Sequence, residues 1–165
     1  MIVIAAVDKN WAIGNKNKLL VSIPNDMKRF RAFTTDNIVV MGRKTLESFP
    51  GGRPLPQRLN IVLTKDKDYD AKGATVVTSI DELKEVLDTE LKNDLREVFV
   101  IGGESIYRQL LPMCDKAYLT MIDNEYEADT FFPNLDNEEG WEVTERSEEQ
   151  TCFDICYEFV TYERK

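Results

Sequence analysis

The fold is decided by the stretch Val98-Phe99-Val100-Ile101-Gly102-Gly103-Glu104-Ser105, where an apolar run ends at paired glycines and continues into a helix pattern. A short apolar run of this kind is typical of a strand buried in a parallel sheet. The spacing from Ser105 to Leu111 is helical, and Pro112 ends the helix because proline lacks a backbone N–H. This order predicts an α/β unit whose ligands bind beyond the carboxyl end of the strand.

Short apolar strands alternate with helices over the first two thirds of the 165 residues. The apolar runs predict strands at 2–7, 38–41, 59–63, 74–77, 98–101 and 118–122. Helices are expected at 24–33 and after Ser79, where Ser79 and Glu82 form a capping box. Two later strands, 141–144 and 153–162, follow one another without a helix and indicate an antiparallel edge. No repeat or linker interrupts the chain, so we expect one α/β domain over residues 1–165.

The composition excludes several classes of function. The chain has 21 basic and 30 acidic residues, a net charge of -9 that repels nucleic acid. Its longest apolar run, 2–7, is too short to span a membrane, and three cysteines without a CxxC pair fit a reducing compartment. We therefore expect a soluble, unexported, cytoplasmic protein. The chain has no histidine, which excludes catalytic Ser-His-Asp and Cys-His relays and the HExxH zinc-binding helix. We therefore expect no metal and a redox reaction whose chemistry is supplied by a cofactor.

Two strand-to-helix junctions carry glycines that let a ligand approach the backbone. The first is Gly42-Arg43-Lys44-Thr45 and the second is Gly102-Gly103. Unpaired amides at a helix start attract anions, so both junctions are candidate phosphate sites, although each is also compatible with a simple tight turn. Two such junctions in one small acidic domain favour a dinucleotide, and Arg43 suits a phosphorylated ribose because guanidinium binds phosphate through two parallel hydrogen bonds.

Asp26 lies on the aromatic side of the helix expected at 24–33, between the directions of Phe30 and Phe33. One interpretation is that Asp26 only stabilises the helix dipole in the first turn. Its inward direction favours another, because a buried carboxylate needs a hydrogen-bonding partner. A cavity that binds a cationic or amidine-like heterocycle would supply that partner.

Three further segments have a functional and a plain interpretation. The stretch from Ala12 to Ser22 is either a surface connection or a mobile flap whose apolar residues close over a ligand. The stretch from Gly52 to Arg58 is either a rigid connector or a site where Arg58 holds a substrate carboxylate. The acidic stretch from Asp136 to Glu149 is expected to be a solvated edge.

These features, in this order, resemble the dihydrofolate reductase family of the bacterial chromosomal type over essentially the whole chain. The resemblance rests on seven motifs: Ala5-Ala6, Ile13-Gly14, Ile23-Pro24-Asn25-Asp26, Met41-Gly42-Arg43-Lys44-Thr45, Arg53-Pro54-Leu55-Pro56, Val100-Ile101-Gly102-Gly103 and Asp129-Thr130-Phe131-Phe132-Pro133.

The resemblance implies an eight-stranded, mostly parallel twisted sheet with an antiparallel C-terminal edge strand, flanked by about four helices. It implies a monomer that uses NADPH to reduce 7,8-dihydrofolate to tetrahydrofolate, with hydride transfer from nicotinamide C4 to pterin C6 and protonation at N5. Partners implied by the resemblance are dihydrofolate and antifolates of the diaminopyrimidine type.

The resemblance also implies roles for individual residues. Asp26 would pair with the pterin 2-amino group and N3, supported by Thr120, and Leu19 and Tyr107 complete the expected catalytic group. The expected substrate-binding residues are Ile4, Ala6, Val7, Asp26, Met27, Phe30, Phe49, Leu55, Arg58, Ile101 and Thr120. The expected cofactor-binding residues are Ala6, Ile13, Gly14, Leu19, Gly42, Arg43, Lys44, Thr45, Leu63, Thr64, Lys65, Ile101, Gly102, Gly103, Glu104, Ser105, Ile106, Tyr107 and Thr130. Gly102 and Gly103 match a pair joined by a cis peptide in the family.

One departure and two alternatives remain. The family usually has a Pro-Trp pair where this chain reads Leu20-Val21, so Val21 lacks the indole N–H that would hold an ordered water. A pteridine or pyrimidine reductase of riboflavin synthesis shares the fold, although the helix that carries Asp26 argues for folate. A flavodoxin-type electron carrier would need a hydroxyl-rich loop after the first strand, whereas Val7 is followed by Asp8-Lys9-Asn10-Trp11.

Overall fold

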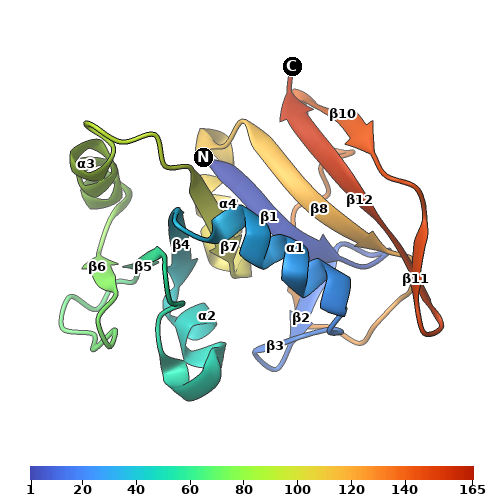
Figure 1. Ribbon diagram of the computed structural model, residues 1–165, viewed down its shortest axis with the longest axis horizontal. Helices are drawn as coiled ribbons and strands as arrows, with labels where there is room; N and C mark the ends of the chain where they lie inside the picture. Colours follow the sequence, from blue (N-terminus) through green and yellow to red (C-terminus); the bar gives the residue numbers. More distant parts are fainter.

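The computed structural model describes residues 1–165, and its main feature is a twisted sheet with the strand order β10-β12-β8-β1-β7-β4-β5-β6 (Figure 1). The strands are β1 (Ile2–Val7), β4 (Ile38–Gly42), β5 (Leu59–Leu63), β6 (Thr75–Val77), β7 (Val98–Gly102), β8 (Lys116–Ile122), β10 (Trp141–Arg146) and β12 (Ile155–Arg164). All pairs from β8 to β6 are parallel, whereas β12 runs antiparallel to β8 and β10 runs antiparallel to β12. The expected mostly parallel sheet with an antiparallel C-terminal edge is confirmed.

Four helices cover the two faces of this sheet. They are α1 (Pro24–Thr34), α2 (Arg43–Ser48), α3 (Ile80–Glu90) and α4 (Glu104–Leu110), with 3-10 turns η1 (Pro50–Gly52) and η2 (Leu111–Met113). Figure 1 shows α1 crossing in front of the sheet and α4 behind it. Leu46 of α2 and the aromatic residues of α1 pack with one apolar cluster, while α3 and α4 contribute to a second cluster on the other face. None of these helices is long and apolar enough to cross a bilayer.

A second, smaller sheet joins residues far apart in the sequence. Its order is β3 (Lys18–Leu19), β2 (Ala12–Asn15) and β9 (Thr130–Phe131), and all its pairs are antiparallel. The segment 12–22, for which a flap was one interpretation, therefore begins as a hairpin. Because β2 also pairs with β9, this hairpin is attached to the loop that follows β8.

Most predicted elements are present within two residues of their expected ends. Ser79 accepts a 3.1 Å hydrogen bond from the Glu82 backbone N–H, as the capping box predicts. The strand expected at 153–162 is wrong at its start. Phe153 lies in a turn with a positive φ of 54° and is 94% exposed, and β11 (Gln150–Cys152) pairs with β12 across that turn. The sequence pattern fails there because Phe153 is apolar but occupies a turn.

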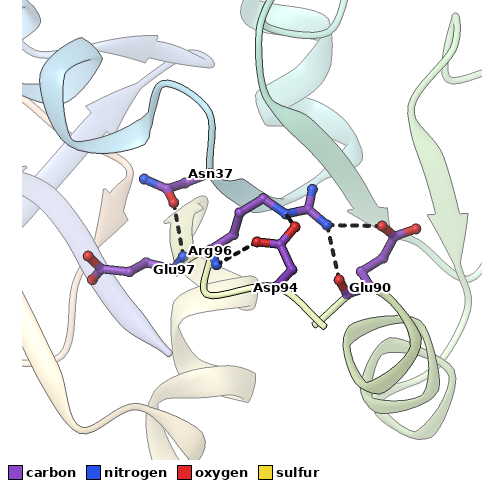
Figure 2. Close-up of polar contacts among 5 residues, drawn as sticks. All are labelled: Asn37, Glu90, Asp94, Arg96 and Glu97. Carbon is purple, nitrogen blue, oxygen red and sulfur yellow. Dashed lines mark hydrogen bonds and ion pairs between the residues drawn. The ribbon is translucent and has the colours of Figure 1, made fainter. Parts of the chain in front are cut away.

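Arg96 joins the end of α3 to the loop that leads into β7 (Figure 2). Its guanidinium donates to the Glu90 carbonyl and carboxylate, each at 3.1 Å, and its Nε lies 2.6 Å from an Asp94 carboxylate oxygen. In the next residue, the Glu97 N–H donates to the Asn37 side-chain oxygen at 2.9 Å (Figure 2). The bond between Glu97 and Asn37 joins the residues just before β7 and β4, whose other ends carry the two glycine junctions.

Candidate active site

The two glycine junctions lie side by side at the carboxyl ends of β4 and β7. Met41 is paired with Gly102 in the sheet, and a Cβ added to Gly103 would lie 3.7 Å from the Thr45 hydroxyl. A Cβ added to Gly42 would come within 2.9 Å of the Ile106 side chain. The Gly102–Gly103 peptide is cis, as the resemblance implies, and Gly102 has a φ of +119°. Both turns therefore present bare backbone at the end of the sheet where α/β proteins bind ligands.

The helices that follow these glycines start without side-chain caps. Gly42 precedes α2 and Gly103 precedes α4, and neither can accept a hydrogen bond from the amides of the first turn. The cations Arg43 and Lys44 are exposed beside the first turn, and Arg43 donates to both carboxylate oxygens of Glu47 at 3.0 Å. The charge of Arg43 is therefore shared with a neighbouring carboxylate rather than free.

The remaining expected cofactor residues surround this junction. Leu63 ends β5 opposite Gly42, and Thr64 and Lys65 follow it. Glu104 is engaged already, because its carboxylate accepts a 2.8 Å hydrogen bond from the Phe131 backbone N–H. Ser105 is exposed and accepts from the Gln109 amide at 2.9 Å, whereas Ile106 is buried.

Tyr107 is buried beneath the second glycine turn. Its hydroxyl donates a 2.8 Å hydrogen bond to the Ile4 carbonyl, and a Cβ added to Gly102 would lie 3.3 Å from its ring. Burial raises the pKa of Tyr107 far above its usual range, so the phenol stays neutral. Tyr107 therefore connects β1 to the base of the glycine turn.

Asp26 is directed inward from α1, as its position on the helix predicts. One carboxylate oxygen accepts a 2.5 Å hydrogen bond from the Thr120 hydroxyl on β8. Burial raises the pKa of Asp26, and the hydrogen bond from Thr120 and the charge of Arg29 oppose that rise. The site thus holds a partly desolvated carboxylate with one oxygen satisfied and the other available to a ligand.

Apolar side chains expected to bind the substrate gather near this carboxylate. Ile4, Phe30, Phe49, Leu55 and Ile101 belong to one apolar cluster that spans α1, β1 and the carboxyl end of β7. Ala6 packs in the adjacent cluster with Ile23.

Val7 and Met27, also expected to bind the substrate, lie outside this apolar cluster. Val7 has no exposed surface and packs in the core with Val3, which alternation along the strand places on the face opposite Ile4. Met27 is 44% exposed and lies outside these clusters.

Arg58 stands at the outer end of this apolar cluster. Its Nε donates to the Thr34 hydroxyl at 3.0 Å, and its guanidinium carbon lies 6.0 Å from the centre of the Phe30 ring. Burial lowers the pKa of Arg58, and the nearby charge of Arg31 lowers it further. Arg58 makes no ion pair with a carboxylate of the protein, so its charge is available to an anion.

The β2–β3 hairpin carries the remaining expected residues. Gly14 pairs with Thr130, and a Cβ on Gly14 would come within 2.9 Å of the Thr130 hydroxyl. Ile13 is partly buried, whereas Leu19 on β3 is 65% exposed. Val21 packs against the cluster of Ile23, and its side chain offers no donor in place of the family's indole.

Several residues that hold the site together were missed by the sequence analysis. Asp8 is buried and accepts backbone hydrogen bonds from Asn10, Ala12 and Tyr126. Asn60 is buried and bonds both the N–H and the carbonyl of Leu55. Arg29 was missed because cations are common on helix surfaces, and no local pattern shows that this one turns toward aromatic rings.

The paired glycine turns and the inward carboxylate beside an apolar cluster define an α/β ligand-binding protein with the geometry of a dinucleotide-dependent reductase. The dihydrofolate reductase family model matches residues 1–164, and the chain belongs to this family. It is 42% identical to dihydrofolate reductase of Bacillus subtilis (strain 168), over 98% of this chain and 93% of that protein. It is 38% identical to dihydrofolate reductase type 3 of Salmonella typhimurium, over 98% and 96% of the two chains.

A solved structure agrees with these relatives. It is dihydrofolate reductase from Enterococcus faecalis complexed with NADP(H) and RAB-propyl, with a TM-score of 0.86 and 36% identity. The match covers 99% of this chain and 95% of that one. The comparisons do not favour the flavodoxin-type carrier or the reductase of riboflavin synthesis.

Proposed function

We propose that this protein reduces 7,8-dihydrofolate to 5,6,7,8-tetrahydrofolate with NADPH. The observation that carries the proposal is Asp26, a partly desolvated carboxylate bonded to Thr120 and set beside the apolar cluster of Ile4 and Phe30. A flat heterocycle with an N–H and an amino group side by side would fit the free carboxylate oxygen and the apolar walls.

The glycine turns fit the dinucleotide. Gly42 and Gly103 precede helices without side-chain caps, so the free amides of those first turns could bind phosphate groups. Arg43, Lys44 and Thr45 on the first turn would hold the phosphorylated ribose and phosphates, with Leu63, Thr64 and Lys65 beside them. Gly102, Gly103, Glu104, Ser105 and Ile106 would hold the central phosphates, and Ala6, Ile13, Gly14, Leu19, Tyr107 and Thr130 would border the nicotinamide end.

The substrate would lie across the apolar cluster. Asp26 would accept hydrogen bonds from the pterin 2-amino group and N3, with Thr120 orienting the carboxylate. Ile4, Met27, Phe30, Phe49, Leu55 and Ile101 would contact the pterin and aminobenzoyl rings. Arg58 would hold the α-carboxylate of the glutamate tail through charge-assisted hydrogen bonds. We assign Val7 to the support behind this site, because its side chain is fully buried.

NADPH, when bound, supplies a hydride from C4 of its nicotinamide to pterin C6. The protein orients the two rings and excludes water, which are the main requirements of the transfer. Substrate N5 must also gain a proton, and the negative charge of Asp26 favours a protonated ring. Leu19 on the hairpin would cover the nicotinamide once ligands are bound.

The proposed function also bears on the domain organisation, oligomeric state and location of the protein. We propose that residues 1–165 form one dihydrofolate reductase domain that acts as a monomer in the cytoplasm, with antifolates of the diaminopyrimidine type as competing ligands. The three free cysteines support a reducing compartment. The net charge of -9 argues against nucleic acid as a partner.

The decisive test is NADPH oxidation, followed by absorbance, with dihydrofolate as substrate across a range of pH. We expect activity in the native protein and a large loss in Asp26→Asn near neutral pH. The loss should be smaller at low pH, where the substrate is already protonated. If Asp26→Asn and the native protein show the same rates at every pH, the role of Asp26 is wrong.

A further inference from the structure

Arg29 lies one helical turn after Asp26 on α1, and its charge is held by aromatic rings instead of by an acid. The guanidinium carbon is 4.1 Å from the centre of the Phe159 ring, 5.0 Å from that of Phe33 and 5.8 Å from that of Tyr118. These distances place the cation over three ring faces. Arg29 forms none of the ion pairs within 4.0 Å in this protein.

The sheet connects the ring under Arg29 to the hydroxyl that binds Asp26. Phe159 on β12 is paired with Thr120 on β8, so their side chains are direct neighbours on the same face. Thr120 bonds Asp26, Phe159 contacts Arg29, and Tyr118 precedes Thr120 by two residues on that face. The Asp26 carboxylate and the Arg29 guanidinium, one helical turn apart, therefore contact two residues that are paired across the β8–β12 strand pair.

The charges of Asp26 and Arg29 act on each other. Burial raises the pKa of Asp26, and the positive charge of Arg29 opposes that rise. Burial lowers the pKa of Arg29, and Asp26, Tyr118 and Glu145 oppose that change. The other charged groups on this face are Glu145, Lys116 and Glu163. The Lys116 amine lies 5.7 Å from the centre of the Tyr118 ring and forms an ion pair with Glu163. Arg29 is thus the cation with the most direct effect on Asp26, in a region where partial burial weakens screening by salt.

We propose that Arg29 is a positioning residue that uses its ring-held charge to keep Asp26 anionic and so sets the pH range in which the site works. The assignment to catalysis rests on the proposed reduction of dihydrofolate, whereas the effect on Asp26 does not. A cation here opposes protonation of the Asp26 carboxylate and of the substrate ring bound to it. Its removal therefore lets the site keep its proton to higher pH.

The test replaces Arg29 with methionine, which keeps apolar contact with the rings but removes the charge. Lys28→Met is the matched control, because it removes the same charge from the neighbouring, exposed position of α1. Arg29→Lys restores a cation, and Arg29→Gln provides a neutral variant if methionine disturbs the packing. Circular dichroism and thermal unfolding establish that each variant is folded.

Two measurements are made on each folded variant. The first is the titration of the Asp26 carboxyl carbon by ¹³C NMR in the ligand-free protein, with the signal assigned by Asp26→Asn. The second is the pH dependence of hydride transfer, from single-turnover oxidation of NADPH by dihydrofolate. We expect Arg29→Met to move both midpoints to higher pH, Arg29→Lys to return them toward the native values, and Lys28→Met to leave them in place.

The outcomes separate the two proposals. If Arg29→Met and Arg29→Gln titrate like Lys28→Met, the proposed role of Arg29 is overturned. If no variant and not even the native protein oxidises NADPH with dihydrofolate, the proposed function fails, and the carboxyl titration still decides the role of Arg29. If the titration moves but the rate profile does not, Arg29 affects Asp26 without setting the pH range, and the proposal is wrong on that point.

Discussion

The Tyr107 hydroxyl on α4 donates a 2.8 Å hydrogen bond to the Ile4 carbonyl on β1, which lies 103 residues earlier in the chain. Both groups are buried, so neither could find water if the bond were lost. The ring also packs edge-on against Phe132, with the ring centres 4.8 Å apart. The contact joins the strand that carries the substrate face to the helix that follows the second glycine turn.

Tyr107→Phe should lower the free energy of unfolding by about 1–3 kcal/mol, because the buried Ile4 carbonyl loses its donor while the ring contacts remain. Urea unfolding measures this loss. The matched control is Tyr126→Phe, since the Tyr126 hydroxyl is buried without a partner and its removal should cost little or even stabilise. Equal losses in the two variants would contradict the importance of the Tyr107 bond.

Asp26→Asn should make the protein more stable at neutral pH even as it reduces activity. Burial raises the pKa of Asp26 above its value in the unfolded chain, so its contribution to stability is complete below the unfolded value and falls as pH rises through the folded value. The Asn side chain does not ionise, so the variant does not lose this stability as the pH rises. Thermal unfolding from pH 3 to 8 should show a stability difference in favour of Asn that grows with pH; a difference independent of pH would refute the account.

Arg43→Ala should weaken NADPH far more than NADH, because only NADPH carries the ribose phosphate that Arg43 would bind. The loss of a charge-assisted hydrogen bond of about 1.5–3 kcal/mol corresponds to roughly 10- to 100-fold in Kd. Glu47→Gln removes the carboxylate that holds Arg43 at 3.0 Å and should tighten NADPH binding. Fluorescence titration with both nucleotides measures these changes, and parallel losses for NADH and NADPH in Arg43→Ala would remove the assignment.

Asn60→Ala should raise the KM for dihydrofolate without a matching change in kcat. Its side chain bonds the Leu55 N–H at 3.0 Å and the Leu55 carbonyl at 2.9 Å, and therefore shapes the segment that carries Leu55 and Arg58 toward the substrate. We also expect a loss of about 1–3 kcal/mol in the free energy of unfolding. Steady-state kinetics measure the effect, and Asn93→Ala, at an exposed turn position, serves as control.

The sequence was most informative where local chemistry decides local structure. Apolar runs located the main strands, and the capping box of Ser79 and Glu82 located the start of α3. The inward direction of Asp26 followed from helical spacing alone. Its partner Thr120, 94 residues away, was expected only through the family resemblance, because helical spacing gives no information about a residue on another element. Arg29 and Asn60 were missed for the same reason: their contacts are set by tertiary packing. The start of the strand expected at 153–162 was wrong because Phe153, although apolar, occupies an exposed turn.

The place of β1 in the sheet has a consequence for how this protein is made. The first strand of the chain pairs on one side with β7 (98–102) and on the other with β8 (116–122), and with no strand from the first half of the chain. During synthesis β1 leaves the ribosome long before either partner exists, and such distant pairings slow folding. Because β7 ends at residue 102 and β8 at residue 122, the first strand stays unpaired until well over half of the chain has been translated.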